Sequence, residues 1–76
     1  MKVRITTSEK DVPESKSEFE TDLPLHQFIL NDMGNLYPNM EELAKDFDAH
    51  ELREGYVMLK NDNPTASYQH IYEVIG

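Results

Sequence analysis

The stretch "MKVRITTSEKDVPESKSEFETDL", residues 1–23, decides the fold because both of its ends carry an alternating pattern. In residues 1–7 apolar and basic side chains alternate, and in residues 17–23 apolar and acidic side chains alternate. A period of two residues is typical of a strand with one buried face. The stretch therefore predicts two strands that are close enough in sequence to pair.

An antiparallel hairpin of these segments would match both faces at once. One face would set two basic side chains against two acidic ones, namely Lys2 and Arg4 against Glu18 and Glu20. The other would gather Val3, Ile5, Phe19 and Thr21. Opposite charges across a strand pair stabilise it by about 0.2–1 kcal/mol each. The segment between the strands, about 8–17, is charged, rich in serine and contains proline, and we expect an exposed polar loop there.

Two helices are predicted next in the chain. The first shows a stripe near helical period, with Thr21 or Asp22 as the cap and Gly34 as the stop; its members are Leu25, Phe28, Ile29 and Met33. In the second, Asn39 is a natural N-cap and Glu42 completes a capping box. Its apolar residues at i, i+3, i+4 and i+7 are Met40, Leu43, Ala44 and Phe47.

The last third of the chain predicts further strands. Residues 56–61, "YVMLKN", have strand composition and precede the turn-rich "NDNPTA". The tail 64–75 fits two structures. As a helix opened by Pro64 it would form an apolar stripe, and as a strand it would mix polar and apolar groups on each face. We expect a strand, because a hairpin needs only the turn already present.

These elements predict one small acidic α+β domain over residues 1–76. We expect a small antiparallel sheet of three to four strands with two helices packed on one face. The order strand, strand, helix, helix, short turn, strand, strand resembles the β-grasp arrangement of ubiquitin-like proteins in order alone. That resemblance implies no function.

The acidic stretch "DFDAHELREG", residues 46–55, contains the chain's densest group of possible metal ligands. A calcium loop needs glycine at its sixth position and glutamate at its twelfth, where this chain has Glu51 and Val57. The zincin helix needs a second histidine, where this chain has Glu54. A divalent-metal site at Asp46, Asp48, His50 and Glu54 is therefore the weaker hypothesis. We expect Asp48 and Glu51 to cap a short helical turn that Gly55 ends, and we predict neither a metal nor a cofactor.

Composition and charge restrict the classes of partner. Fifteen acidic residues against seven basic ones give a net charge of −8. A surface of this sign repels nucleic-acid phosphate and is attracted to basic surfaces. The chain has no cysteine, no signal-peptide pattern at its start and no apolar run long enough for a membrane span. We expect a cytoplasmic protein that binds neither nucleic acid nor membranes directly.

Two groups of residues are candidates for binding a partner. The first is an acidic face along consecutive helical turns, formed by Glu41, Glu42, Asp46, Asp48, Glu51 and Glu54. Charged faces are most often simply solvated. The second is a set of tyrosines that could anchor an interface if exposed, namely Tyr37, Tyr68 and Tyr72.

No catalytic motif is present: the three glycines are isolated, and no serine has a nucleophile-elbow context. The sequence therefore favours a non-enzymatic module that docks on a basic protein surface. Such a module would be a small regulator or inhibitor of a nucleic-acid-binding protein, as small acidic proteins of phages and mobile elements often are. The alternative hypothesis is a structural or assembly subunit that homo-oligomerises through a sheet edge, where a strand can accept a partner strand.

Overall fold

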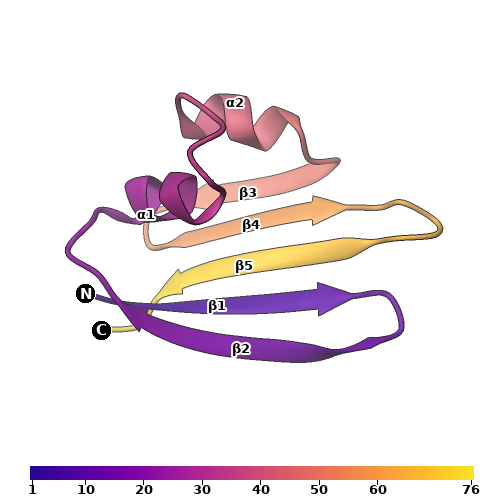
Figure 1. Cartoon of the computed structure of the whole chain (residues 1–76), viewed down its shortest axis with the longest axis horizontal. Helices are drawn as coiled ribbons and strands as arrows, with labels where there is room; N and C mark the ends of the chain where they lie inside the picture. The colour runs from indigo at the N-terminus through magenta and orange to yellow at the C-terminus, as the bar shows by residue number, and fades with distance from the viewer.

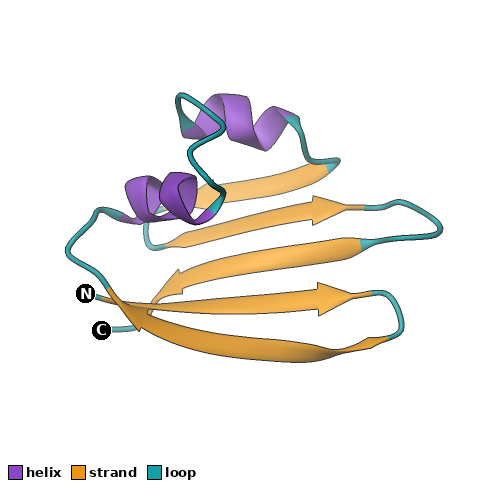
Figure 2. Cartoon of the chain, in the orientation of Figure 1, coloured by secondary structure: helices purple, strands orange, loops and turns teal.

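The computed structural model describes every residue from Met1 to Gly76 and is dominated by one antiparallel sheet (Figures 1 and 2). In chain order the elements are β1 (Lys2–Glu9), β2 (Val12–Glu20), α1 (Leu25–Asp32), α2 (Met40–Lys45), β3 (Ala49–Arg53), β4 (Tyr56–Asn61) and β5 (Tyr68–Val74). The strand order is β2-β1-β5-β4-β3, and all four pairings are antiparallel. The last strand therefore lies in the centre of the sheet, between β1 and β4 (Figure 1).

The β1–β2 hairpin forms with the predicted pairing of charges. Lys2 lies opposite Glu20 and Arg4 opposite Glu18, and the Arg4 guanidinium lies 3.1 Å from the Glu18 carboxylate. On the other face Val3 lies opposite Phe19, as expected. The expected neighbour Thr21 lies beyond the end of β2, and Ser17 takes the place opposite Ile5.

The prediction of a loop at about 8–17 is wrong in its secondary structure. Strand β2 begins at Val12, so only Lys10 and Asp11 connect the two strands, with Asp11 in the left-handed region at φ 62°. All nine residues of β2 are exposed, because β2 is an edge strand with a neighbour on one side only. A strand without a buried face needs no apolar alternation, and its composition therefore resembles that of a loop.

The core lies on one face of the sheet, which we call the core face. Side chains alternate between the two faces of a strand, and four strand residues on this face are buried: Val3, Val57, Leu59 and Tyr72. Four helix residues complete the buried cluster: Ile29, Leu30, Met40 and Leu43. We call the opposite face the open face, because no helix residue of that cluster packs on it.

The start of α2 and the end of α1 form as their sequences predict. The Asn39 side chain accepts a hydrogen bond from the Glu42 amide at 2.9 Å and caps α2. At the end of α1, the Gly34 amide donates to the Asn31 carbonyl and the Asn35 amide donates to the Leu30 carbonyl. This is the Schellman pattern, and Gly34 occupies the left-handed C′ position at φ 80°. The predicted caps of α1 are wrong: Pro24 occupies the N-cap position without a side-chain hydrogen bond, and Thr21 accepts from the Leu23 amide.

The predicted architecture, three to four strands with two helices packed on one face, is wrong. The sheet has five strands, and the β-grasp-like order is lost because β3 replaces the short helical turn expected at 48–54. The helices contain eight and six residues, so they are about 12 and 9 Å long. A five-stranded sheet is about 24 Å wide. Two such short helices cannot form a layer over it, and in Figure 1 they lie beside β3 and β4.

The tail forms the predicted strand, β5. It is not an edge strand, because β1 and β4 pair with it on both sides. The free edges of the sheet belong to β2 and β3. Neither helix has the length and apolar character needed to cross a membrane.

Candidate interaction surface

The structure divides the predicted acidic face among several elements. Glu41 and Glu42 lie in the first turn of α2, and Asp46 follows its last residue. Asp48 lies in the connection to β3, and Glu54 lies in the turn between β3 and β4. Glu51 lies opposite Met58 in the β3–β4 pair, which places both side chains on the open face. The continuous helical face expected from the sequence is therefore not formed.

Three of these acids have defined partners near α2. Glu42 forms an ion pair with Lys45 at 2.9 Å. Asp46 accepts a hydrogen bond from the Tyr37 hydroxyl. Asp48 accepts from the Asp62 amide at 2.7 Å, and so joins the start of β3 to the end of β4. The prediction that Asp48 caps a helical turn is wrong, because the amide that its carboxylate accepts from belongs to Asp62, just after the end of β4.

The three candidate tyrosines differ in exposure. The Tyr72 side chain is 1% exposed, and its hydroxyl donates to the Asp32 carboxylate at 2.8 Å. Burial, and then this hydrogen bond, raise the pKa of Tyr72. Tyr37 and Tyr68 are half-buried, and the hydrogen bond to Asp46 raises the pKa of Tyr37. Tyr72 is therefore a core residue, and only Tyr37 and Tyr68 can present a ring to a partner.

Aromatic rings and carboxylates meet on the core face beside the helices. The Tyr68 ring packs edge-on against Phe47 at 6.3 Å and against His70 at 5.4 Å, and Asn61 donates to its hydroxyl at 2.7 Å. The half-buried His70 also lies beside Thr7, with 3.5 Å between its Nδ1 and the Thr7 hydroxyl. We define the aromatic–acid patch by the residues Glu9, Asp32, Tyr37, Asp46, Tyr68 and His70.

Burial lowers the pKa of His70, although the carboxylates of Asp32 and Glu9 act in the opposite direction. The imidazole therefore favours its neutral form here. The negative charge of the aromatic–acid patch comes from its carboxylates, Glu9, Asp32 and Asp46, which are all exposed.

One exposed apolar side chain projects near the helices. Leu36, in the connection between α1 and α2, is 79% exposed, more than any other large apolar residue. It follows Gly34 and Asn35, both in the left-handed region, so the α1 C-cap fixes where the leucine emerges. Sequence reasoning missed Leu36. The glycine–asparagine pair before it was the available signal for a displayed loop residue.

The net charge is distributed unevenly between the two sides of the sheet. By strand register, the open face carries five basic and four acidic side chains, namely Lys2, Arg4, Lys16, Arg53, Lys60, Glu18, Glu20, Glu51 and Glu73. The other eleven acids have no register position on the open face, although Asp62 forms an ion pair with Lys60 at 3.3 Å, and we call this set the acid-rich surface: Glu9, Asp11, Glu14, Asp22, Asp32, Glu41, Glu42, Asp46, Asp48, Glu54 and Asp62. Lys10 and Lys45 are the only bases that also have no register position on the open face. The excess negative charge therefore does not come from the register positions of the open face.

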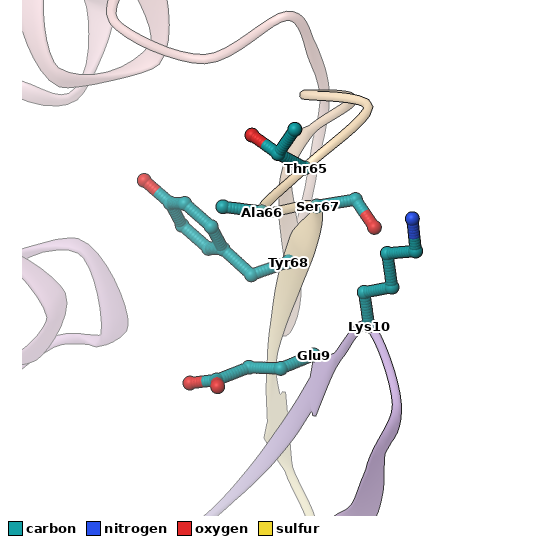
Figure 3. Close-up of a pocket in the computed structure, with 6 residues that line it drawn as sticks. All are labelled: Glu9, Lys10, Thr65, Ala66, Ser67 and Tyr68. Atoms are coloured by element: carbon teal, nitrogen blue, oxygen red, sulfur yellow. The ribbon is translucent and has the colours of Figure 1, made fainter.

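The largest hollow of about 320 Å³ lies where the β1–β2 and β4–β5 turns meet (Figure 3). The Glu9 and Tyr68 side chains point to one side of the sheet and Lys10 to the other (Figure 3). The structure does not gather Asp46, Asp48, His50 and Glu54 into a site. No group of three or more His, Cys, Asp or Glu side chains is placed to hold a metal ion.

Comparisons with models of protein families, with curated proteins and with solved structures found no match to this chain.

Proposed function

We propose that this protein is a non-enzymatic interaction module, acting in the cytoplasm, whose acid-rich surface binds a basic surface of another protein. The observation that supports it is the separation of charge. By strand register the open face is nearly balanced, and eleven acids against two bases have no register position on it. A separated charge creates a directional field, which attracts a basic partner to one side of the molecule.

The contact itself would form around the helices. Tyr37 offers a half-buried ring beside the carboxylate of Asp46, and Tyr68 offers a second half-buried ring. An arginine or lysine from a partner could place its cation over a tyrosine ring and pair with the neighbouring acid. Leu36 supplies an exposed apolar side chain of the kind that fills a small pocket on a partner.

A nucleic-acid-binding protein is the partner class that this chemistry fits best. Surfaces that hold phosphate are clusters of lysine and arginine, which the acid-rich surface would attract. Occupation of such a cluster would exclude nucleic acid, so binding would make this protein a small regulator or inhibitor. Direct binding of nucleic acid is disfavoured by the same charge.

The proposal is tested by a pull-down from the source cell's lysate with the tagged full chain as bait. Bound proteins are washed at low and then at high salt and identified by mass spectrometry. We expect a basic nucleic-acid-binding protein to be retained at low salt and released at high salt, because ion pairs between exposed groups are screened. The purified partner would then be tested for loss of nucleic-acid binding as this protein is added.

A pair of matched variants makes the test specific to the surface. Glu41→Lys with Glu42→Lys reverses two charges beside the aromatic–acid patch, and we expect at least a tenfold loss of affinity for the partner. Glu18→Lys with Glu20→Lys makes the same change of net charge on the open face of the edge strand β2 and should leave affinity within about threefold. Equal losses from both pairs, or recovery of the same proteins by both, would overturn the proposal.

A further inference from the structure

The open face has an ordered arrangement of charges that the proposed function does not use. Two neighbouring rows of side chains cross all five strands of this face. From β2 to β3, the first row reads Glu18, Arg4, Glu73, Tyr56 and Arg53. The second reads Lys16, Thr6, Ile71, Met58 and Glu51. The strand register alone fixes the membership of both rows.

The charges in these rows change sign across the central strand β5. Glu18 at one edge corresponds to Arg53 at the other, and in the next row Lys16 corresponds to Glu51. A half-turn about an axis along β5 exchanges β2 with β3 and β1 with β4, and it leaves each row in its place. The face is therefore complementary in charge to a copy of itself that is turned over in this way.

We propose that the open face binds the open face of a second copy of this chain, with the two-fold axis along β5. Such an interface is isologous, so each contact occurs twice. Glu18 of each copy faces Arg53 of the other, and Lys16 faces Glu51. In the first row Arg4 faces Tyr56, whose ring already lies under the Arg53 guanidinium of its own chain at 4.4 Å.

The centre of this interface is apolar. Ile71 lies at the axis and faces its own copy, and Thr6 faces Met58; all three are half-buried or buried in the single chain. Glu73 is the one charge that meets its own copy, and Arg4 on the neighbouring strand lies in the same row on both sides. Packed sheets cross at about 30°. That crossing displaces the outer pairs by a few ångströms, which long lysine, arginine and glutamate side chains can span.

A second copy fits this face better than a basic partner does. Four acids and five bases give the open face almost no net charge, so it does not attract a strongly basic surface. Two copies of a chain with charge −8 repel one another wherever their acid-rich surfaces meet. The open face is the surface on which this repulsion is least, and pairing through it directs both acid-rich surfaces outward.

The size of the face predicts a weak, concentration-dependent dimer. Five strands with about six residues each cover about 24 by 20 Å, or about 500 Å² of flat area per copy. Stable specific interfaces bury about 800 Å² per partner, and smaller ones belong to transient complexes. We therefore expect monomer and dimer to exchange as the concentration changes.

Sedimentation equilibrium of the full chain over micromolar to millimolar concentration tests the proposal. The mass should rise from 8.8 kDa toward twice that value. Lys16→Glu alone and Glu51→Lys alone should each weaken the dimer at least tenfold. The double variant, which restores opposite charges across the interface, should return the dissociation constant to within about threefold of the parent.

Lys45→Glu on α2 is the matched control, because it changes net charge as Lys16→Glu does but lies on the acid-rich surface. Circular dichroism of each variant checks that the sheet is intact. Lys16 is exposed on an edge strand, so its replacement should not affect folding. A mass that stays at 8.8 kDa, equal effects of Lys16→Glu and Lys45→Glu, or a double variant that does not recover would each overturn the proposal.

Discussion

At the residue scale, Tyr72 links the sheet to α1. Its ring is buried in the core, and its hydroxyl donates to the Asp32 carboxylate at 2.8 Å. Tyr72→Phe keeps the ring and removes the hydrogen bond to a charged acceptor, so we expect a loss of about 1–2 kcal/mol in the free energy of unfolding. Urea denaturation measures this. Tyr56→Phe is the control, because the Tyr56 hydroxyl has no hydrogen-bond partner, and it should change stability by less than about 0.5 kcal/mol.

His70 makes the free energy of unfolding depend on pH in the mildly acidic range. Burial lowers the pKa of His70 in the folded state, so the unfolded chain takes up the proton more readily. The free energy of unfolding should therefore fall as pH is lowered through the unfolded value of about 6.5. His70→Gln should flatten the curve between about pH 7.5 and 5.5. His26→Gln on the exposed side of α1 should not alter it, and an unchanged curve for the His70 variant would contradict the argument.

Residue patterns predicted local pairing well and exposure poorly. Lys2 and Arg4 identified Glu18 and Glu20 as partners because charge complementarity across two strands is visible in the sequence. The three tyrosines had similar sequence contexts, yet one is buried and two are half-buried. The exposure of each tyrosine depends on where α1 and α2 lie relative to β5. No local pattern reports that position, so the candidate anchors could not be separated.

At the element scale, α2 depends on its N-cap. A six-residue helix has few internal hydrogen bonds, and the Asn39 side chain satisfies one of the free amides at its start. Asn39→Ala should cost about 1 kcal/mol in the free energy of unfolding. Asn39→Asp keeps an oxygen acceptor and should retain most of that stability. A loss that is equal in both variants would show that the cap hydrogen bond is not what stabilises the helix start.

The error at β3 has a physical cause at the same scale. Asp48, Glu51 and Gly55 match a capped helical turn, and local capping signals are strong because they involve neighbouring residues. In the structure Asp48 precedes the edge strand β3, Glu51 lies within it, and Gly55 lies in the turn after it at φ 73°. His50 and Leu52 alternate with Glu51 and Arg53, which was the strand signal. Pairing with β4 decided between the two readings, and that pairing is a long-range feature that capping rules do not include.

At the scale of the whole molecule, the separation of charge could not be read from the sequence. Net charge was available, but Glu51 and Glu41 seemed equivalent members of one acidic face. Only the strand register assigns Glu51 to the open face, where it has Arg53 as an ion-pair partner at 2.9 Å. The sequence therefore predicted that the candidate surface is negatively charged, and it predicted some of the residues that form it. Which acids belong to that surface depends on the register of the five-stranded sheet.

This separation predicts how salt affects stability. Like charges on the acid-rich surface destabilise the folded chain, and salt screens them, so raising NaCl from about 0.01 to about 0.15 M should raise the melting temperature. Glu9→Gln with Glu41→Gln removes two unpaired acids from that surface and should reduce the salt response. Glu18→Gln with Glu73→Gln removes two acids from the balanced open face, where Arg4 lies opposite both, and should leave the response unchanged or larger. Thermal unfolding monitored by circular dichroism at protein concentrations low enough to keep the chain monomeric distinguishes the two pairs. The same reduction from both would mean that the negative charge acts as a uniform property of the surface and not through one side of the sheet.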